Sequence, residues 1–263
     1  MSEQLEKKYL NHRVFAELTE YADFYCSLSF SIMNWISQGT KAITNIDTYV
    51  YSSIQGTLES IHDLLLKGRI NDSYALLRKY YDSSIINVYS NLYLSDHVSI
   101  DNFIVSQIDN WRKGTETLPE FRIMSKYIKD SPRLSAISAL LYHDSTYQTI
   151  RERCNDHTHY NYYHNVLLND NEILLQNRLA FLETFSKDLE DIFIQHFSYV
   201  FYLNDHYWMS SDHIDSLDVG ATPEEGSQYF VAPFIQNIFD TVIKAKRPDI
   251  ANEIKSKSLM TIE

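Results

Sequence analysis

Glycine, proline and cysteine are scarce in this chain of 263 residues, which contains 6, 5 and 2 of them respectively. Few glycines and prolines leave few positions for tight turns, which disfavours an all-β fold and a glycine-rich phosphate-binding loop. Two cysteines, Cys26 and Cys154, are too few for a disulfide framework. The chain also lacks a long uninterrupted apolar run and an apolar signal segment, so we expect a cytoplasmic protein that does not cross a membrane.

Positive charge is in short supply as well. The 23 Lys and Arg residues against 35 Asp and Glu residues give a net charge of −12. Binding to duplex DNA by broad charge neutralisation needs many contacts between basic side chains and phosphates, so we expect no duplex DNA partner and, at most, a small basic site. Hydrophobic residues at 44% and aromatic residues at 14% indicate a well-packed globular protein.

Three long segments carry apolar residues at helical spacing, which predicts three long helices. The first lies between Asn45 and Gly68, the second opens at Asn71, and the third runs from about Glu172 to Leu203 and should be the longest. Gly68 is predicted to cap the first long helix at its C-terminal end. The connection from this helix to the second long helix is short, which predicts an antiparallel hairpin. The residues expected to be buried are Val50, Ile54, Leu58, Ile61 and Leu65, then Tyr74, Leu77, Tyr81, Ile85, Val88 and Leu92, and finally Leu182, Phe185, Leu189, Ile192, His196 and Val200.

The rest of the chain is predicted to hold shorter helices and one long polar loop. Residues Asn204–Gln228 are polar and acidic, which indicates a surface loop with room for short strands. We therefore predict an all-α fold, with a helical bundle over residues 1–203 and a loop plus C-terminal helices over residues 204–263 packed on the same domain. The shorter helices are expected at Glu3–Ser37, Ile100–Arg112, Pro119–Ile128, Arg133–Tyr142, Tyr147–Asn161, Val231–Lys244 and Pro248–Lys257.

The densest group of chemically capable side chains begins at Arg151. Residues four apart share one face of a helix, so Arg151, Asn155 and His159 form one patch. A guanidinium binds phosphate, an imidazole transfers protons near neutral pH, and an amide can position both groups. The patch suits phosphodiester chemistry. The alternative is a polar helix whose histidines hydrogen-bond to neighbouring helices.

Arg153, His157 and Asn161 form a second set, roughly on the opposite face of the same helix. Four residues of this region could also be interpreted as a metal site, namely His157, His159, His164 and Asp156. Structural metal sites draw on pairs of ligands at short spacing, and no second cluster of that kind follows. We therefore expect no metal and no other cofactor.

Two further features bear on the patch. Arg78 and Asp82 stand four residues apart in the second long helix, where we interpret them as an intrahelical ion pair; the alternative is a pair that positions the patch from across the bundle. The 20 tyrosines include a group at positions 160, 162 and 163. Such groups can stack on unpaired bases, although packing and subunit contact are the more common uses of tyrosine.

Two segments resemble HEPN-domain proteins. Residues 58–94 (LESIHDLLLKGRINDSYALLRKYYDSSIINVYSNLYL) are similar to the first hairpin of that family, and residues 151–161 (RERCNDHTHYN) to its terminal-helix signature. HEPN proteins are α-helical bundles, commonly dimeric, and many are metal-independent RNases of toxin–antitoxin and abortive-infection systems. Their signature is an Arg followed directly by a polar residue, often Asn, with four to six residues between the Arg and a His.

The resemblance assigns Asn155 to the polar position and His159 to the histidine. Cys154 stands where the compact motif would place the arginine. Arg153 has the family's spacing to His159, whereas Arg151 shares the helix face of His159 but lies further back. Arg151 also has the family's spacing to the histidine at position 157.

The resemblance implies a HEPN-like up-down helical bundle with a core at about residues 44–203 and additional N- and C-terminal helices. It also implies a metal-independent endoribonuclease of a bacterial defence or toxin system, acting as a homodimer on single-stranded or tRNA-like RNA. An antitoxin or a nucleotidyltransferase is the partner that such systems suggest. The alternative is a catalytically inactive helical module that binds a nucleotide, RNA or a protein, which the cysteine at position 154 and the acidic balance favour.

Overall fold

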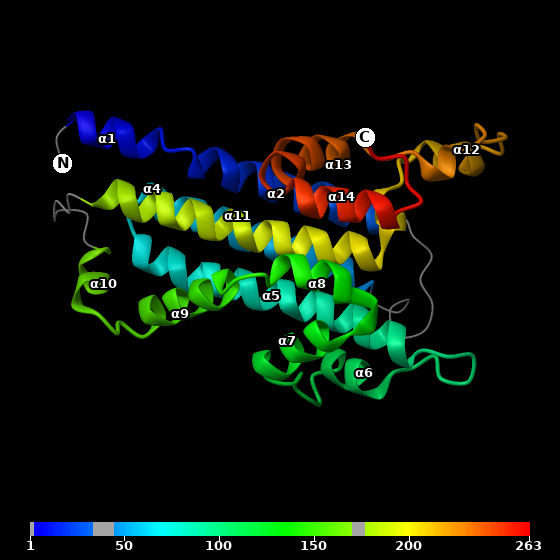
Figure 1. The fold of residues 1–263 in the computed structure, drawn as a ribbon, viewed down its shortest axis with the longest axis horizontal. Coiled ribbons are helices and arrows are strands. Elements are labelled where there is room, and N and C mark those ends of the chain that lie inside the picture. Colours follow the sequence, from blue (N-terminus) through cyan, green and yellow to red (C-terminus); the bar gives the residue numbers. More distant parts are fainter. Residues whose placement is uncertain (1–2, 34–44, 170–176) are drawn as a thin grey trace. The chain divides into compact units, whose positions relative to one another are not determined.

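The computed structural model describes residues 3–33, 45–169 and 177–263, and these residues form helices joined by turns and two isolated β-bridges (Figure 1). The predicted all-α class is confirmed. None of the helices in the described ranges combines the length and the apolar character that a membrane span requires. The N-terminal and long helices are α1 (Glu3–Leu10), α2 (Val14–Met33), α4 (Ile46–Leu66), α5 (Ile70–His97) and α11 (Arg178–Leu203).

The chain forms two compact units, each assembled from segments far apart in the sequence. Unit 1 contains Met1–Cys26, Val50–Ser84 and Asp144–Phe193, and unit 2 contains Ser27–Tyr49, Ile85–His143 and Ile194–Glu263. The helices α2, α4, α5 and α11 contribute residues to both units. The change in composition after residue 203 is not a boundary between units, because the end of α11 and the C-terminal residues belong to the same unit.

The three predicted apolar stripes are buried. Every stripe residue lies in the core except Val50, which is half-buried. Gly68 ends α4 as predicted: its φ of 72° is in the left-handed region, and the Arg69 amide donates to the carbonyl of Leu64 at 2.9 Å. Only three residues separate α4 from α5, so the connection is as short as the hairpin prediction required.

Aromatic rings fill the core of unit 1. Tyr21 of α2 stacks on Phe193 of α11 with ring centroids 4.0 Å apart, and the hydroxyls of Tyr25 and Tyr80 lie 2.9 Å apart. Tyr25 also packs against Tyr51 of α4. Eleven of the 20 tyrosines are buried in this way, so packing explains most of the unusual tyrosine content.

Several predicted boundaries were wrong. The segment Glu3–Ser37 is two helices where it is described, with residues 34–37 outside the described ranges. The third long helix was predicted to begin at about Glu172, but residues 172–176 lie outside the described ranges. It was also predicted to be the longest, whereas α11 has 26 residues and α5 has 28. The helix expected from Ile100 begins only at residue 106, because Ser99 and Asn102 pair in a tight bridge.

The polar region after residue 203 is not an unbroken loop, because short helices interrupt it and Met209 bridges to Val231. The C-terminal helix α14 has the predicted bounds and packs against α8 and the π-helical turn η4 (Figure 1). The elements of unit 2 after α5 are α6 (Ser106–Arg112), α7 (Phe121–Asp130), η1 (Pro132–Leu134), α8 (Ser135–Leu141), η2 (Asp205–Trp208), α12 (Asp212–Asp218), η3 (Ser227–Tyr229), α13 (Pro233–Ile238), η4 (Phe239–Lys244) and α14 (Pro248–Lys257).

A buried carboxylate organises the polar interior of unit 2. Asp47 is 1% exposed and accepts hydrogen bonds from the amides of Asn87 (3.0 Å) and Asn91 (2.7 Å) and from the hydroxyl of Tyr207. His196 in turn donates its Nε2 proton to the side-chain oxygen Oδ1 of Asn87 at 3.0 Å. Burial lowers the pKa of His196 to about 3, which keeps that imidazole neutral.

Replacing Asp47 by Ala should destabilise the protein by about 3 kcal/mol or more, because three buried donors would lose their acceptor. Chemical unfolding followed by circular dichroism measures this change. Asp101→Ala removes an exposed carboxylate of the same unit and should change stability by less than about 0.5 kcal/mol. Equal stabilities for the two variants would contradict a central role for Asp47.

Candidate functional site

The cluster predicted from the sequence lies on α9 (Thr146–Thr158) and the turn that follows it, in unit 1. The buried residues of α9 are Tyr147, Ile150, Cys154 and His157, which recur at steps of three, four and three. This stripe faces the core of the unit. The charged side chains of α9 lie on the two flanks of this buried stripe.

Arg151 lies on one flank and binds α5. Its Nη1 donates to the carboxylate of Asp82 at 2.6 Å, and Arg78 donates through Nε to the same carboxylate at 3.1 Å. The predicted pair of Arg78 and Asp82 is therefore present, and it also reaches the patch. Two guanidinium groups share one carboxylate, which leaves this group of three side chains with a net positive charge.

Arg153 lies on the other flank and binds α11. Its Nη1 donates to both carboxylate oxygens of Asp188 at 2.5 Å, and the hydroxyl of Tyr74 approaches the same carboxylate at 3.4 Å. Asp188 is 3% exposed. Burial raises the pKa of the Asp188 carboxyl, and the hydrogen bonds from Arg153 oppose that shift.

His157 is a core residue. It is 4% exposed, its ring stacks on Tyr74 at a centroid distance of 4.0 Å, and its Nδ1 donates to the side-chain oxygen of Asn71 at 2.8 Å. Burial lowers its pKa to about 4, so the imidazole is neutral near pH 7. An imidazole held in this way cannot meet a substrate, so His157 is a structural residue.

Cys154, which follows Arg153 and belongs to the buried stripe of α9, is fully buried. Burial raises the pKa of its thiol to about 12, which removes the thiolate that nucleophilic chemistry requires. An arginine at this position would carry a guanidinium into the core. The compact motif of the HEPN family therefore does not fit the present backbone at position 154.

The end of α9 differs from the prediction, because the helix stops at Thr158 and not at Asn161. Tyr160 adopts a φ of 50°, in the left-handed region, and the Asn161 amide donates to the carbonyl of Asp156 at 3.0 Å. This hydrogen-bond pattern is the Schellman ending, here built on a tyrosine in place of the usual glycine. It places His159 at the C-terminal cap of the helix.

Asn155 and His159 are the two patch residues that remain open to solvent. Asn155 is half-buried and His159 is exposed, and neither side chain hydrogen-bonds to another residue in the described part of the chain. Arg151 is partly exposed beside them on the same flank of α9. Of the residues predicted to be catalytic, His159 is exposed, Asn155 is half-buried and His157 is buried. The two arginines are each bound to a carboxylate and partly exposed, by 23% for the side chain of Arg151 and 31% for that of Arg153.

A hollow of about 320 Å³ lies beside Arg153 in unit 1. Its wall carries four carboxylates and two cations, so its potential repels a phosphate. The carboxylates belong to Asp144, Glu183, Asp188 and Asp191, and the cations to Arg153 and Lys187. The flank of α9 that carries Arg151 is the more suitable of the two for an anion.

Sequence reasoning missed Asp188 and Asn71, which hold the interior side of α9. The signal for Asp188 was present, because this acidic residue stands inside the apolar stripe of α11, three residues after Phe185 and four before Ile192. A charge at such a position needs a buried partner. Nothing in the sequence identified Arg153 as that partner.

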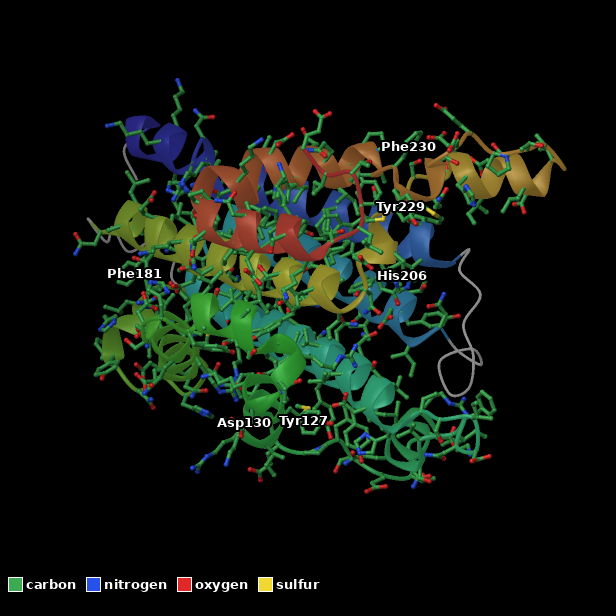
Figure 2. All side chains as sticks on the ribbon, turned by 45° about the vertical axis from the view of Figure 1, so that its right-hand side comes forward. Tyr127, Asp130, Phe181, His206, Tyr229 and Phe230 are labelled. Atoms are coloured by element: carbon green, nitrogen blue, oxygen red, sulfur yellow. The ribbon has the colours of Figure 1, made fainter. Side chains whose placement is uncertain are left out.

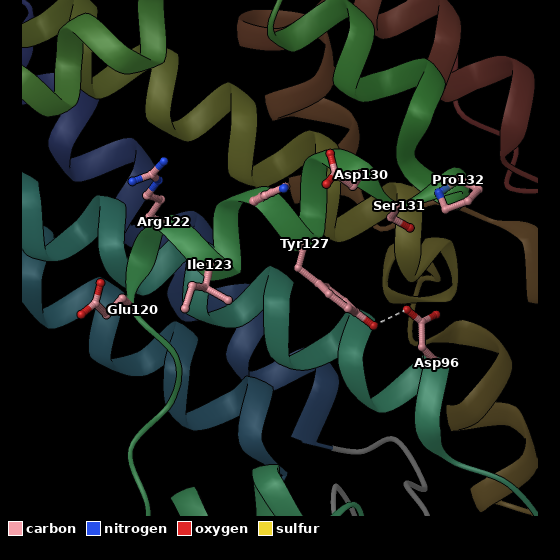
Figure 3. A pocket seen from close by; sticks show the side chains of 9 residues that line it. Asp96, Glu120, Arg122, Ile123, Tyr127, Asp130, Ser131 and Pro132 are labelled. Carbon is pink, nitrogen blue, oxygen red and sulfur yellow. Dashed lines mark hydrogen bonds between the residues drawn. The ribbon is translucent and has the colours of Figure 1, made fainter.

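Unit 2 holds a separate hollow of about 680 Å³ along α7, which contains none of the predicted site residues. Tyr127 crosses it to donate a hydrogen bond to Asp96 at 2.7 Å, and Ile123 and Pro132 form apolar parts of its wall (Figure 3). Its lining also includes three acidic and two basic residues, which are Asp96, Glu120, Asp130, Arg122 and Lys126. In the described residues, no group of three or more His, Cys, Asp or Glu side chains is arranged to hold a metal ion.

Comparisons with protein-family models, with curated proteins and with solved structures find no significant match to this chain. The resemblance to HEPN proteins thus depends on the two segments that carry it.

Acid should destabilise the protein in part through His157. Its pKa of about 4 in the folded protein lies below the ordinary 6.5, so the unfolded chain takes up a proton first as the pH falls. The contribution of His157 to the free energy of unfolding is full above about pH 6.5 and decreases as the pH falls toward 4, by on the order of 3 kcal/mol.

Urea unfolding of the wild type and of His157→Phe at about pH 7 and about pH 4.5 measures this contribution. The phenylalanine retains a ring against Tyr74 but does not titrate, so the variant should lose less stability between the two pH values. A variant that loses as much stability as the wild type would show that His157 does not contribute.

Proposed function

We propose that this protein is a HEPN-like, metal-independent endoribonuclease of a bacterial defence or toxin system, and that its active patch is formed by Arg151, Asn155 and His159. The observation that carries the proposal is the arrangement on one flank of α9. An exposed imidazole, a guanidinium that Asp82 fixes in place and an amide whose side chain has no hydrogen-bond partner among the described residues are spaced four residues apart along α9 and its C-terminal cap.

The chemistry uses the RNA as its own nucleophile. The ribose 2′-hydroxyl attacks the adjacent phosphorus, the bond from phosphorus to the 5′-oxygen breaks, and the products are a cyclic 2′,3′-phosphate and a 5′-hydroxyl end. One group removes the proton from the 2′-hydroxyl and another delivers a proton to the leaving oxygen. His159 performs one of these transfers, and a guanidinium stabilises the charge on the phosphate.

Arg151 is the better candidate for the phosphate ligand. It shares Asp82 with Arg78, so this group of three side chains carries more positive than negative charge. Arg153 lies beside a hollow in which carboxylates outnumber cations two to one. The phosphodiester of RNA is a monoanion near neutral pH, and it is attracted to the first environment and repelled by the second.

One patch supplies a single accessible histidine, whereas the reaction needs both a base and an acid. A second copy of the chain would supply the other imidazole, so we propose a homodimer in which two α9 helices bring their patches together. The exposed position of His159 at the end of α9 leaves it available for such a meeting.

A second candidate is a catalytically inactive module that binds RNA or a partner protein through the same patch. The observation that favours it is that both arginines are already held by carboxylates, while the position of the family's arginine is a buried cysteine. An inactive module would bind its ligand without cleaving it.

Purified protein should cleave single-stranded or tRNA-like RNA in the presence of EDTA, and His159→Ala should lower the rate by roughly 10²–10⁴-fold because it removes a general acid–base. His143→Ala, which removes an exposed histidine of unit 2, is the matched control and should cleave like the wild type. Gel analysis of end-labelled RNA measures both. Cleavage that persists in a folded His159→Ala protein, or that EDTA stops, would overturn the metal-independent assignment.

The same assay decides between the two arginines. Arg151→Ala should be nearly as inactive as His159→Ala. Arg153→Ala leaves Asp188 buried without its partner and should lower the folded fraction, but the protein that remains folded should keep its activity. Circular dichroism corrects for the folded fraction. Binding of RNA without cleavage by the folded wild-type dimer would favour the inactive module.

A further inference from the structure

Three rings lie in a stack at the surface of unit 1, directly after the candidate patch. The ring of Tyr162 stacks on that of His164 with centroids 5.6 Å apart and planes inclined by 14°, and His164 stacks on Phe181 at 6.2 Å and 27°. Phe181, which is labelled in Figure 2, belongs to α11. The stack is therefore anchored on a long helix. Tyr162 is 54% exposed and forms the open end of the stack.

The segment that carries these rings is held by specific hydrogen bonds. Asn161 and Asn165 both donate side-chain hydrogen bonds to Asp156 of α9, at 2.7 and 2.9 Å. Tyr160 holds the left-handed conformation that turns the chain away from the helix axis. Tyr162 then adopts an extended conformation as the N-terminal cap of α10 (Tyr163–Leu167). The exposed rings therefore project from an ordered turn.

We propose that this stack is a binding platform for an unpaired base of single-stranded RNA, which adds to it as the next ring on Tyr162. The inference rests on the proposed function, because it names the part of the substrate that the protein recognises. His159 lies three residues before Tyr162, so a base on the stack would hold the neighbouring ribose and phosphate near the imidazole.

The concentration of exposed tyrosine at this turn supports a ligand with a flat ring. Of the 20 tyrosines, only five are exposed, and three of these are Tyr160, Tyr162 and Tyr163. Exposing aromatic rings to water is unfavourable, and bases stack on aromatic side chains whatever their sequence. Inclinations of 14° and 27° are close to parallel, which is the geometry that a stacking base would continue.

The charge of the protein favours the same conclusion. Unit 1 contains 11 Lys and Arg residues against 18 Asp and Glu residues, so phosphate contacts cannot supply most of the affinity for RNA. Stacking on rings does not depend on net charge. Recognition through the bases also excludes duplex RNA, whose bases are already stacked and paired.

The test is binding of fluorescent single-stranded 2′-O-methyl RNA to the wild-type chain, measured by anisotropy. This RNA lacks the attacking hydroxyl, so binding is measured apart from cleavage. Tyr162→Ala should weaken binding by about ten-fold or more, and Tyr162→Trp should preserve it, because stacking needs a ring and not a hydroxyl. Tyr49→Ala, which removes a tyrosine that is 70% exposed on α4 in unit 2, should leave binding unchanged.

Two further results belong to the expected pattern. A duplex of the same sequence should bind more weakly than the single strand. A plot of the logarithm of the binding constant against the logarithm of the salt concentration should have a slope of magnitude below about 1.5, as expected for about two phosphate contacts. Size-exclusion chromatography with light scattering should give the same mass for Tyr162→Ala and the wild type.

The results that would overturn the proposal differ from those that would overturn the ribonuclease assignment. Unchanged binding by a folded Tyr162→Ala protein, or no binding of any single-stranded RNA by the wild type, would overturn the platform. A change of mass in Tyr162→Ala without a change in RNA affinity would make the stack a subunit contact. Tyr162-dependent binding without any cleavage of ordinary RNA would support the binding platform and contradict the ribonuclease assignment.

Discussion

Two ion pairs fix α9, and the candidate patch depends on them. Asp82 of α5 holds Arg151 on one flank, and Asp188 of α11 holds Arg153 on the other. Between them, α9 buries the stripe that includes Cys154 and His157 and that faces the core of unit 1. The buried stripe sets the rotation of α9, and the two ion pairs tie its flanks to α5 and α11. Removing a buried partner such as Asp188 would release that constraint, typically at a cost of about 3–5 kcal/mol.

The same carboxylates decide what each face of α9 can do. A guanidinium bonded to a nearly buried carboxylate has lost much of its attraction for a phosphate, which is the situation of Arg153. Arg151 differs, because Asp82 is shared with a second arginine and the local charge stays positive. The histidines divide in a parallel way: burial keeps His157 neutral and enclosed, whereas His159 lies beyond the last helical turn. The two histidines of this segment thus have opposite surroundings, one buried and one exposed.

The apolar periodicity of the sequence was enough to predict the long helices. Burial follows a period of 3.6 residues, and the stripes on α4, α5 and α11 are long enough for that period to be unambiguous. The site was less predictable, because its partners come from other helices. The contact between Arg153 and Asp188 joins residues 35 positions apart, and no local pattern encodes it. The early end of α9 was missed because its left-handed residue is Tyr160, whereas sequence signals for helix ends rely on glycine or asparagine.

The left-handed tyrosine connects the helix end to the aromatic stack. A β-carbon in this conformation costs on the order of 1 kcal/mol, which the surrounding hydrogen bonds must offset. Asp156 does so by accepting hydrogen bonds from Asn161 and Asn165. Glycine would have ended α9 with less strain but without a ring at that position. The turn therefore retains an aromatic side chain where a simpler cap was available, and it does so next to the one accessible histidine of α9. Strain of this kind persists where the surrounding structure determines the conformation, and here that structure orients His159 and Tyr162 from the same short turn.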